Sequence, residues 1–139
     1  MEIDELIDDN NKHLWKSINE THNCRIQFVN DRNEYACFTK NRSVTFYVPE
    51  LNKNSAPFTH ELLHVFLRQK KIFIGASLKR SVSSSTSLRK IYSERLLEHM
   101  GNCFDHIKML PYYLDMNYER KLFLYEYHVN KCSSEELAN

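Results

Sequence analysis

Glycine, proline and long apolar runs are all scarce in this chain. Its 139 residues include only two glycines and three prolines, which excludes collagen-like and proline-rich low-complexity proteins. No apolar run approaches the roughly 20 residues that a membrane-spanning helix requires, so we expect no membrane partner. No segment repeats along the sequence, which excludes a solenoid or a propeller.

Paired cysteines, a leader segment and a strong net charge are also missing. The four cysteines are Cys24, Cys37, Cys103 and Cys132, and no two of them form a CxxC pair. The chain does not open with the basic and then apolar segment of a secretory signal, so we expect free thiols in a cytoplasmic protein. The net charge is only +1, which gives no support to binding of nucleic acid or membrane through overall charge.

The material for a single folded domain is present. Hydrophobic residues make up 42% of the chain, which excludes disorder throughout, and the length suits one domain over residues 1–139. Helical spacing predicts a first helix within 3–21, broken near Asn10–Asn11. Alternating, β-branched and aromatic residues predict strands, and these lie at 24–29, 35–40 and 43–49. We expect them to form a small antiparallel sheet.

The second half of the chain has helical patterns. A helix is predicted over 55–70, with Ser55 as its N-cap and Pro57 in its first turn. The serine-rich segment 81–87 is predicted to be a mobile loop. A long helix follows over 88–110 and is expected to end before Pro111, with one or two short helices after it. Strands and helices are segregated, which indicates an α+β fold.

The helix predicted over 55–70 carries an HExxH pattern. His60 and His64 lie one turn apart on the same side, so both imidazoles can bind one metal ion. Glu61 is offset from His60 by about 100°, where its carboxylate can reach a water molecule without binding the metal itself. Two imidazole ligands and a general base are the groups that a hydrolytic zinc site needs.

The segment "FTHELLHVFL" resembles the active-site helix of the zincin metallopeptidases. The likeness is specific over about ten residues, and the order of strand, active-site helix and ligand helix extends it to about half of the chain. It implies a minimal zincin-like domain that binds zinc through His60 and His64 and uses Glu61 as general base. The tight pattern with a glycine and a third histidine is absent, because Leu67 and Lys70 stand at those positions.

A third protein ligand must therefore come from elsewhere, and the helix predicted over 88–110 is the best source. Its expected buried stripe has period 3.6 and consists of Leu96, Met100, Cys103, Ile107 and Leu110. His99, Asn102 and His106 flank this stripe, whereas Glu98 and Asp105 fall on the opposite side, toward solvent.

His106 is the preferred third ligand, because Asn102 precedes it by one turn on the same edge of the helix. His99, Glu98 and Asp105 remain open as alternatives. In the small intracellular peptidases of the ImmA/IrrE type a carboxylate fills this role, so a histidine here would be a departure from them. His13, His22 and His128 have no partner pattern, and the tyrosines near the ligand helix are expected to pack; these are Tyr92, Tyr112, Tyr113 and Tyr118.

The resemblance implies a small cytoplasmic zinc peptidase that cleaves a protein or peptide substrate, with a regulatory protein partner as a further possibility. In zincins the strand before the active-site helix forms the edge of the cleft, and here that strand is 43–49. One alternative is a zincin-fold binding module without hydrolysis, against which the intact Glu61 argues. The other is nucleic-acid binding through the basic segment 68–90.

Overall fold

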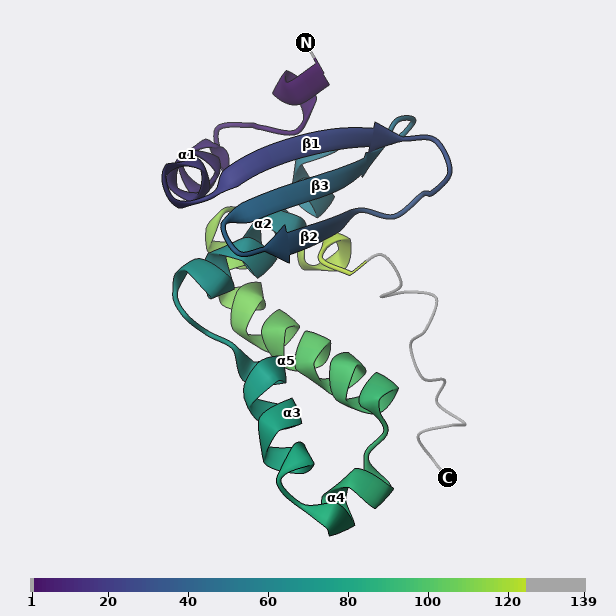
Figure 1. The fold of residues 1–139 in the computed structure, drawn as a ribbon. Helices are drawn as coiled ribbons and strands as arrows, with labels where there is room; N and C mark the ends of the chain where they lie inside the picture. Colours follow the sequence, from purple (N-terminus) through teal and green to yellow (C-terminus); the bar gives the residue numbers. More distant parts are fainter. Residues whose placement is uncertain (1, 125–139) are drawn as a thin grey trace, which may run out of the picture.

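The computed structural model describes residues 2–124, and Figure 1 shows its helices and strands. Their order is 3₁₀ helix Glu2–Glu5, α1 Lys12–Thr21, β1 Asn23–Val29, β2 Ala36–Lys40, β3 Ser43–Pro49, α2 Ser55–Gln69, α3 Ile74–Ser83, α4 Thr86–Ile91, α5 Glu94–Asp115 and 3₁₀ helix Arg120–Leu122. The α+β class is confirmed. The three predicted strands are also confirmed to within about one residue, as is the break in the first helix.

The sheet is mixed, so the prediction of an antiparallel sheet is wrong for one strand. The order is β1-β3-β2, in which β2 and β3 are antiparallel and β1 and β3 are parallel. A tight turn joins β2 to β3, and Asn41 takes the left-handed conformation there with φ 57°. The connection after β1 instead carries the chain past β3 to the far edge. The alternation within β1 predicts a strand but not the direction of its partner.

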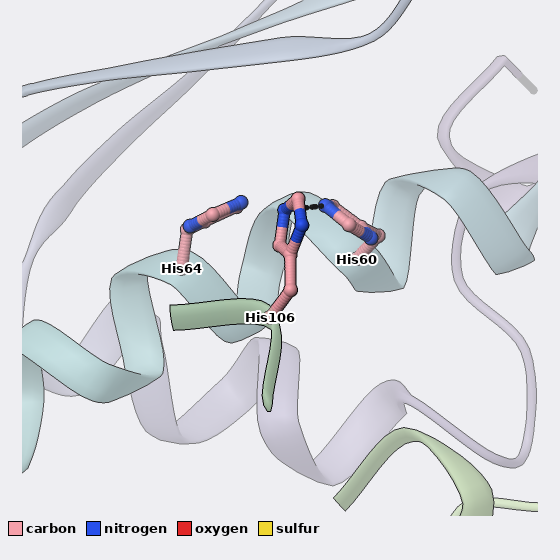
Figure 2. A group of neighbouring side chains, drawn as sticks. All are labelled: His60, His64 and His106. Atoms are coloured by element: carbon pink, nitrogen blue, oxygen red, sulfur yellow. Dashed lines mark hydrogen bonds between the residues drawn. The ribbon is translucent and has the colours of Figure 1, made fainter. Parts of the chain in front are cut away.

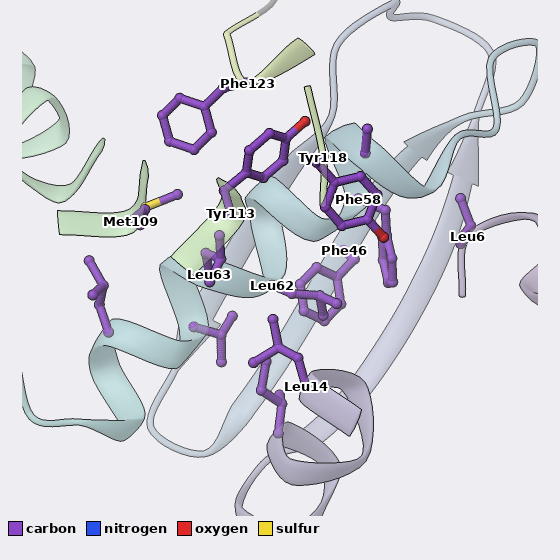
Figure 3. Packing of buried hydrophobic residues seen from close by; sticks show 14 of the residues in the cluster. Leu6, Leu14, Phe46, Phe58, Leu62, Leu63, Met109, Tyr113, Tyr118 and Phe123 are labelled. Atoms are coloured by element: carbon purple, nitrogen blue, oxygen red, sulfur yellow. The ribbon is translucent and has the colours of Figure 1, made fainter. Parts of the chain in front are cut away.

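The core lies between the sheet and α2 (Figure 3). Phe46 of β3 and Phe58 of α2 are fully buried, with ring centroids 5.3 Å apart, and Trp15 of α1 packs against both. Burial of each large apolar side chain contributes roughly 1.5–3 kcal/mol, so this contact fixes α2 against the sheet. The far end of α5 joins the same core through Met109 and Tyr113.

The start of α2 is fixed by Asn54, not by Ser55 as predicted. Asn54 has an extended backbone, and its side chain accepts a hydrogen bond of 2.9 Å from the N–H of Ala56. Pro57 lies in the first turn, as predicted. Further along, Thr59 accepts a 2.8 Å hydrogen bond from the buried side chain of Asn11, which also donates to the carbonyl of Leu6. The N-terminal segment is thereby tied to α2.

Asp8 ties the same segment to the residues that follow α5. The hydroxyl of Tyr118 donates to its carboxylate at 2.7 Å, and the N–H groups of Asn10 and Asn11 donate to it as well. Burial acts to raise the pKa of Asp8, but hydrogen bonds from Ser55, Tyr118 and the two N–H groups outweigh it and lower that pKa.

The serine-rich segment is helical, so the prediction of a mobile loop is wrong. Helix α3 runs through Ser83, and the side chain of Ser85 caps α4 by accepting from the N–H of Leu88. Ser81 and Ser84 donate their hydroxyl hydrogens to main-chain carbonyls three or four residues earlier. These local bonds let serines remain in or beside helices.

Helix α5 also differs from its prediction at both ends. It begins at Glu94, after the cap residue Ser93, and it continues through Pro111 to Asp115. A proline inside a helix costs about 3 kcal/mol. Met109 and Tyr113 are fully buried on either side of Pro111, and this burial offsets the cost. One short helix does follow, Arg120–Leu122, and the rest of the predicted short helices lies outside the described residues.

The two glycines of the chain meet where α3 and α5 run side by side (Figure 1). A methyl group on Gly101 would lie 2.9 Å from Cα of Gly75, closer than real side chains allow. The absence of both side chains therefore sets how closely α5 approaches α3. This contact fixes the position of the helix that carries His106.

Two composition-based expectations concern thiols and membranes. Cys24, Cys37 and Cys103 are free, as expected, and Cys132 lies outside the described residues. Within residues 2–124, none of the helices combines the length and the apolar character that crossing a bilayer requires.

Candidate metal centre

Three histidines from two helices converge on one point (Figure 2). His60 and His64 come from α2, and His106 comes from α5. One nitrogen atom of each ring lies within 4.8 Å of the other two, and Nε2 of His60 is 3.1 Å from Nε2 of His106. These are the residues that the sequence predicted as metal ligands, and within the described part of the chain they form a group able to hold a metal ion.

The spacing of the nitrogen atoms fits a tetrahedral ion. Zinc–nitrogen bonds of about 2.05 Å at tetrahedral angles place two ligand nitrogens about 3.3 Å apart. The separation of 3.1 Å between His60 and His106 is close to this value. Two imidazole nitrogens that face each other can share one hydrogen or one cation, and a cation would use the lone pairs of both. The donor set alone does not decide which metal is bound.

The protonation state of the site also favours a cation. Burial, together with the neighbouring His64 and His106, lowers the pKa of His60 to about 3, although the main chain of Phe123 acts in the opposite direction. Burial and the proximity of His64 lower the pKa of His106 to about 4, although Asp105 acts in the opposite direction. Both rings are therefore neutral near pH 7, and only a neutral imidazole can bind a metal.

Asp105 is buried beside the site, so its predicted position toward solvent is wrong. Its side chain accepts a 2.6 Å hydrogen bond from Nη2 of Arg68, and the same oxygen lies 3.7 Å from Nδ1 of His64. Burial acts to raise the pKa of Asp105, but His64 and Arg68 outweigh it and lower that pKa. A carboxylate on Nδ1 orients the ring of His64 so that Nε2 is directed at the cluster.

Glu61 lies next to the first ligand but points toward a different neighbour. Burial raises the pKa of its carboxyl group, and the electrostatic influence of His64, hydrogen bonding from Cys37 and the charge of Arg32 act in the opposite direction. Cys37 is on β2, so the carboxyl group of α2 contacts the edge strand of the sheet. A carboxyl group with a raised pKa beside a metal site is suited to proton transfer.

The other candidates for a third ligand are separate from the cluster. Glu98 is exposed, as predicted, and forms an ion pair of 3.2 Å with Lys79. His99 is exposed, and its Nε2 lies 3.7 Å from the sulfur of Cys103. Asn102 is exposed and lines the same cleft as His106.

The cluster opens into a cleft of about 1440 Å³. Its walls come from β2, α2, α3, α5 and the segment 122–124. Strand β3 lies between β1 and β2, so the prediction that 43–49 forms the edge of the cleft is wrong. The edge strand beside the cleft is β2, whose Ala36, Cys37 and Thr39 line the cleft. The order of elements along the chain favours β3 as the strand at the edge of the cleft, because β3 directly precedes α2.

Phe123 forms part of the site, although no pattern in the sequence points to it. Its ring centroid lies 4.7 Å from that of His60 and 5.6 Å from that of His106. Arg68 and Cys37 were also missed, because only the folded chain brings them beside Asp105 and Glu61. Tyr113 and Tyr118 pack against each other, as predicted, with centroids 5.1 Å apart.

His13 and His22 are not among the residues of the site. His13 is exposed, and Nδ1 of His22 lies 2.8 Å from the hydroxyl of Thr21. His128 lies outside the described residues.

Comparison of the chain with protein-family models, curated proteins and solved structures finds no match.

Proposed function

We propose that this protein is a zinc-dependent peptidase with a minimal zincin-like domain. The observation that carries the proposal is the convergence of His60, His64 and His106 in an open cleft, with Glu61 directly after the first ligand. The three histidines would hold the ion and leave a fourth position for a water molecule or substrate. The chemistry, the zinc and a cytoplasmic location are parts of the same proposal.

Zinc in this position would supply Lewis acidity, which polarises a carbonyl group and makes a water molecule easier to deprotonate. Glu61 would accept the proton from the attacking water molecule and deliver it to the nitrogen atom of the leaving amine. The raised pKa of its carboxyl group supports this role, because the group must hold the proton between the two steps. Asp105 and Arg68 would keep His64 in place during the reaction.

The substrate in this proposal is an extended segment of a protein. Strand β2 is at the edge of the sheet and lines the cleft, so a substrate segment can add to it through main-chain hydrogen bonds. The segment would then lie along the side of the cleft from which Cys37 contacts Glu61. A narrow requirement for an extended segment suits a peptidase with few substrates.

The alternative of nucleic-acid binding through 68–90 has weaker support. Two of the basic residues in this segment are paired with acidic ones, since Arg68 contacts Asp105 and Lys79 contacts Glu98. These pairs reduce the positive charge that is free to contact phosphate groups.

The test compares wild type with Glu61→Gln in the native host. Glutamine keeps the size of the side chain but cannot accept the proton, so zinc content and folding should persist while cleavage falls by orders of magnitude. New protein N-termini are measured by proteomics in both strains. If the two sets are the same under conditions in which the protein acts, the peptidase proposal fails and a zincin-fold binding module takes its place.

A further inference from the structure

The wall of the cleft formed by α5 carries a histidine and a cysteine, two residue types that can bind metal ions, outside the three-histidine group. His99 and Cys103 are both exposed, and both line the cleft. Nε2 of His99 lies 3.7 Å from Sγ of Cys103, which is a free thiol. Neither side chain takes part in the reaction proposed above.

The geometry of this pair suits an ion. The two residues are four apart in one helix, so their side chains lie one above the other on the same face. A tetrahedral zinc ion with bonds of about 2.3 Å to sulfur and about 2.05 Å to nitrogen separates these two ligands by about 3.6 Å. The observed 3.7 Å differs little from this, so binding needs almost no rearrangement.

We propose that His99 and Cys103 form a second, two-ligand site for a borderline or soft divalent cation such as Zn²⁺ or Co²⁺. Thiolate and imidazole are the ligands that such ions prefer, and water completes the coordination. On binding, the S–H bond of Cys103 breaks, a sulfur–metal bond forms and the proton passes to solvent. No oxidation or reduction takes place.

The second site lies beside the three-histidine centre. The midpoint of the pair is five residues before His106, which is about 7.5 Å along the helix axis at 1.5 Å per residue. A cation bound there would lie on the wall of the cleft that α5 forms. The inference requires no particular reaction at the centre.

Cobalt(II) alone is a suitable probe, because a cobalt–thiolate bond gives an intense charge-transfer band in the near ultraviolet that imidazole ligands do not give. The full chain, reduced and metal-free, is titrated with Co²⁺ and followed by absorbance. Wild type should show the band. Cys103→Ser should abolish it, and His99→Ala should weaken the Co²⁺ affinity measured from the band at least tenfold. Both residues are exposed, so neither change should unfold the protein.

Matched variants separate this site from its neighbours. His60→Ala should remove the cobalt bound by the three histidines and leave the charge-transfer band intact, so failure of one site is distinguishable from failure of the other. Cys24→Ser, Cys37→Ser and Cys132→Ser should each retain the band. Absence of the band in wild type, or its persistence in Cys103→Ser, overturns the proposal.

Discussion

The contact between Gly75 and Gly101 predicts how the stability of the protein depends on the packing of α3 against α5, the helix that carries His106. Gly101→Ala introduces a methyl group 2.9 Å from Cα of Gly75, whereas Gly75→Ala introduces one 3.5 Å from Cα of Gly101. The second distance is an ordinary van der Waals contact, and the first requires α3 and α5 to move apart. The same chemical change should therefore have different effects at two positions that face each other.

The magnitude follows from two opposing terms. Overpacking at a contact made only of backbone costs about 1–3 kcal/mol, because no side chain can rotate away. Alanine in the middle of a helix recovers about 1 kcal/mol relative to glycine. Gly101→Ala should therefore destabilise by about 1 kcal/mol, with a range of roughly 0–2. Gly75 lies in the first turn of α3, where the gain is smaller, so Gly75→Ala should stay within about 0.5 kcal/mol of wild type.

Thermal and urea unfolding of the two variants and of the double variant provide the assay. For a domain of this size, 1 kcal/mol corresponds to a shift of about 3–5 °C in the melting temperature. The double variant should be destabilised by more than the sum of the two single effects, because its two methyl groups meet. If Gly101→Ala melts above the temperature of wild type, the two helices are not held at the distance described, and the reasoning is wrong.

Three further predictions concern the candidate metal centre and the N-terminal segment. Zinc should raise the melting temperature of wild type by much more than that of His60→Ala, since only the folded chain gathers the three imidazoles; equal shifts would contradict the site. Asp105→Asn should weaken zinc affinity by about 10–100-fold in a calorimetric titration, and His106→Ala should weaken it more; the reverse order would make Asp105 a direct ligand. The stabilising contribution of Asp8 is present above its ordinary pKa of 3.8 and is lost as the pH falls through the lowered pKa of the folded state, so urea midpoints of Asp8→Asn should depend less on pH in this acidic range.

The helix with the HExxH pattern could be predicted because its signals are local. The apolar spacing, the proline in the first turn and the two histidines one turn apart all lie within 55–70. Such signals do not depend on the path of the rest of the chain. The parallel pairing of β1 does depend on that path, since the order β1-β3-β2 results from the connection between β1 and β2.

The orientation of α5 could be predicted only in part. His106 flanks the predicted apolar stripe, but Ile107 of that stripe is 66% exposed. The buried positions of α5 are instead Leu97, Gly101, Asp105, Met109 and Tyr113. Within the sequence of α5 alone, Gly101 and Asp105 are not residue types that predict a buried helix face. Their burial depends on Gly75 and Arg68, which come from other helices, and no periodicity within α5 contains that information.

The contact between Cys37 and Glu61 has a consequence for how the proposed peptidase would hold its substrate. A strand added to β2 would lie about 4.8 Å from it, and its side chains would alternate between the two faces of the sheet. Cys37 and Thr39 face the cleft, whereas Phe38 points to the other face and is 62% exposed. The substrate would therefore present one set of side chains toward Glu61 and the other toward Phe38. Cys37 of β2 contacts Glu61, the proposed base. The register of the substrate on β2 would therefore determine which peptide bond lies next to Glu61.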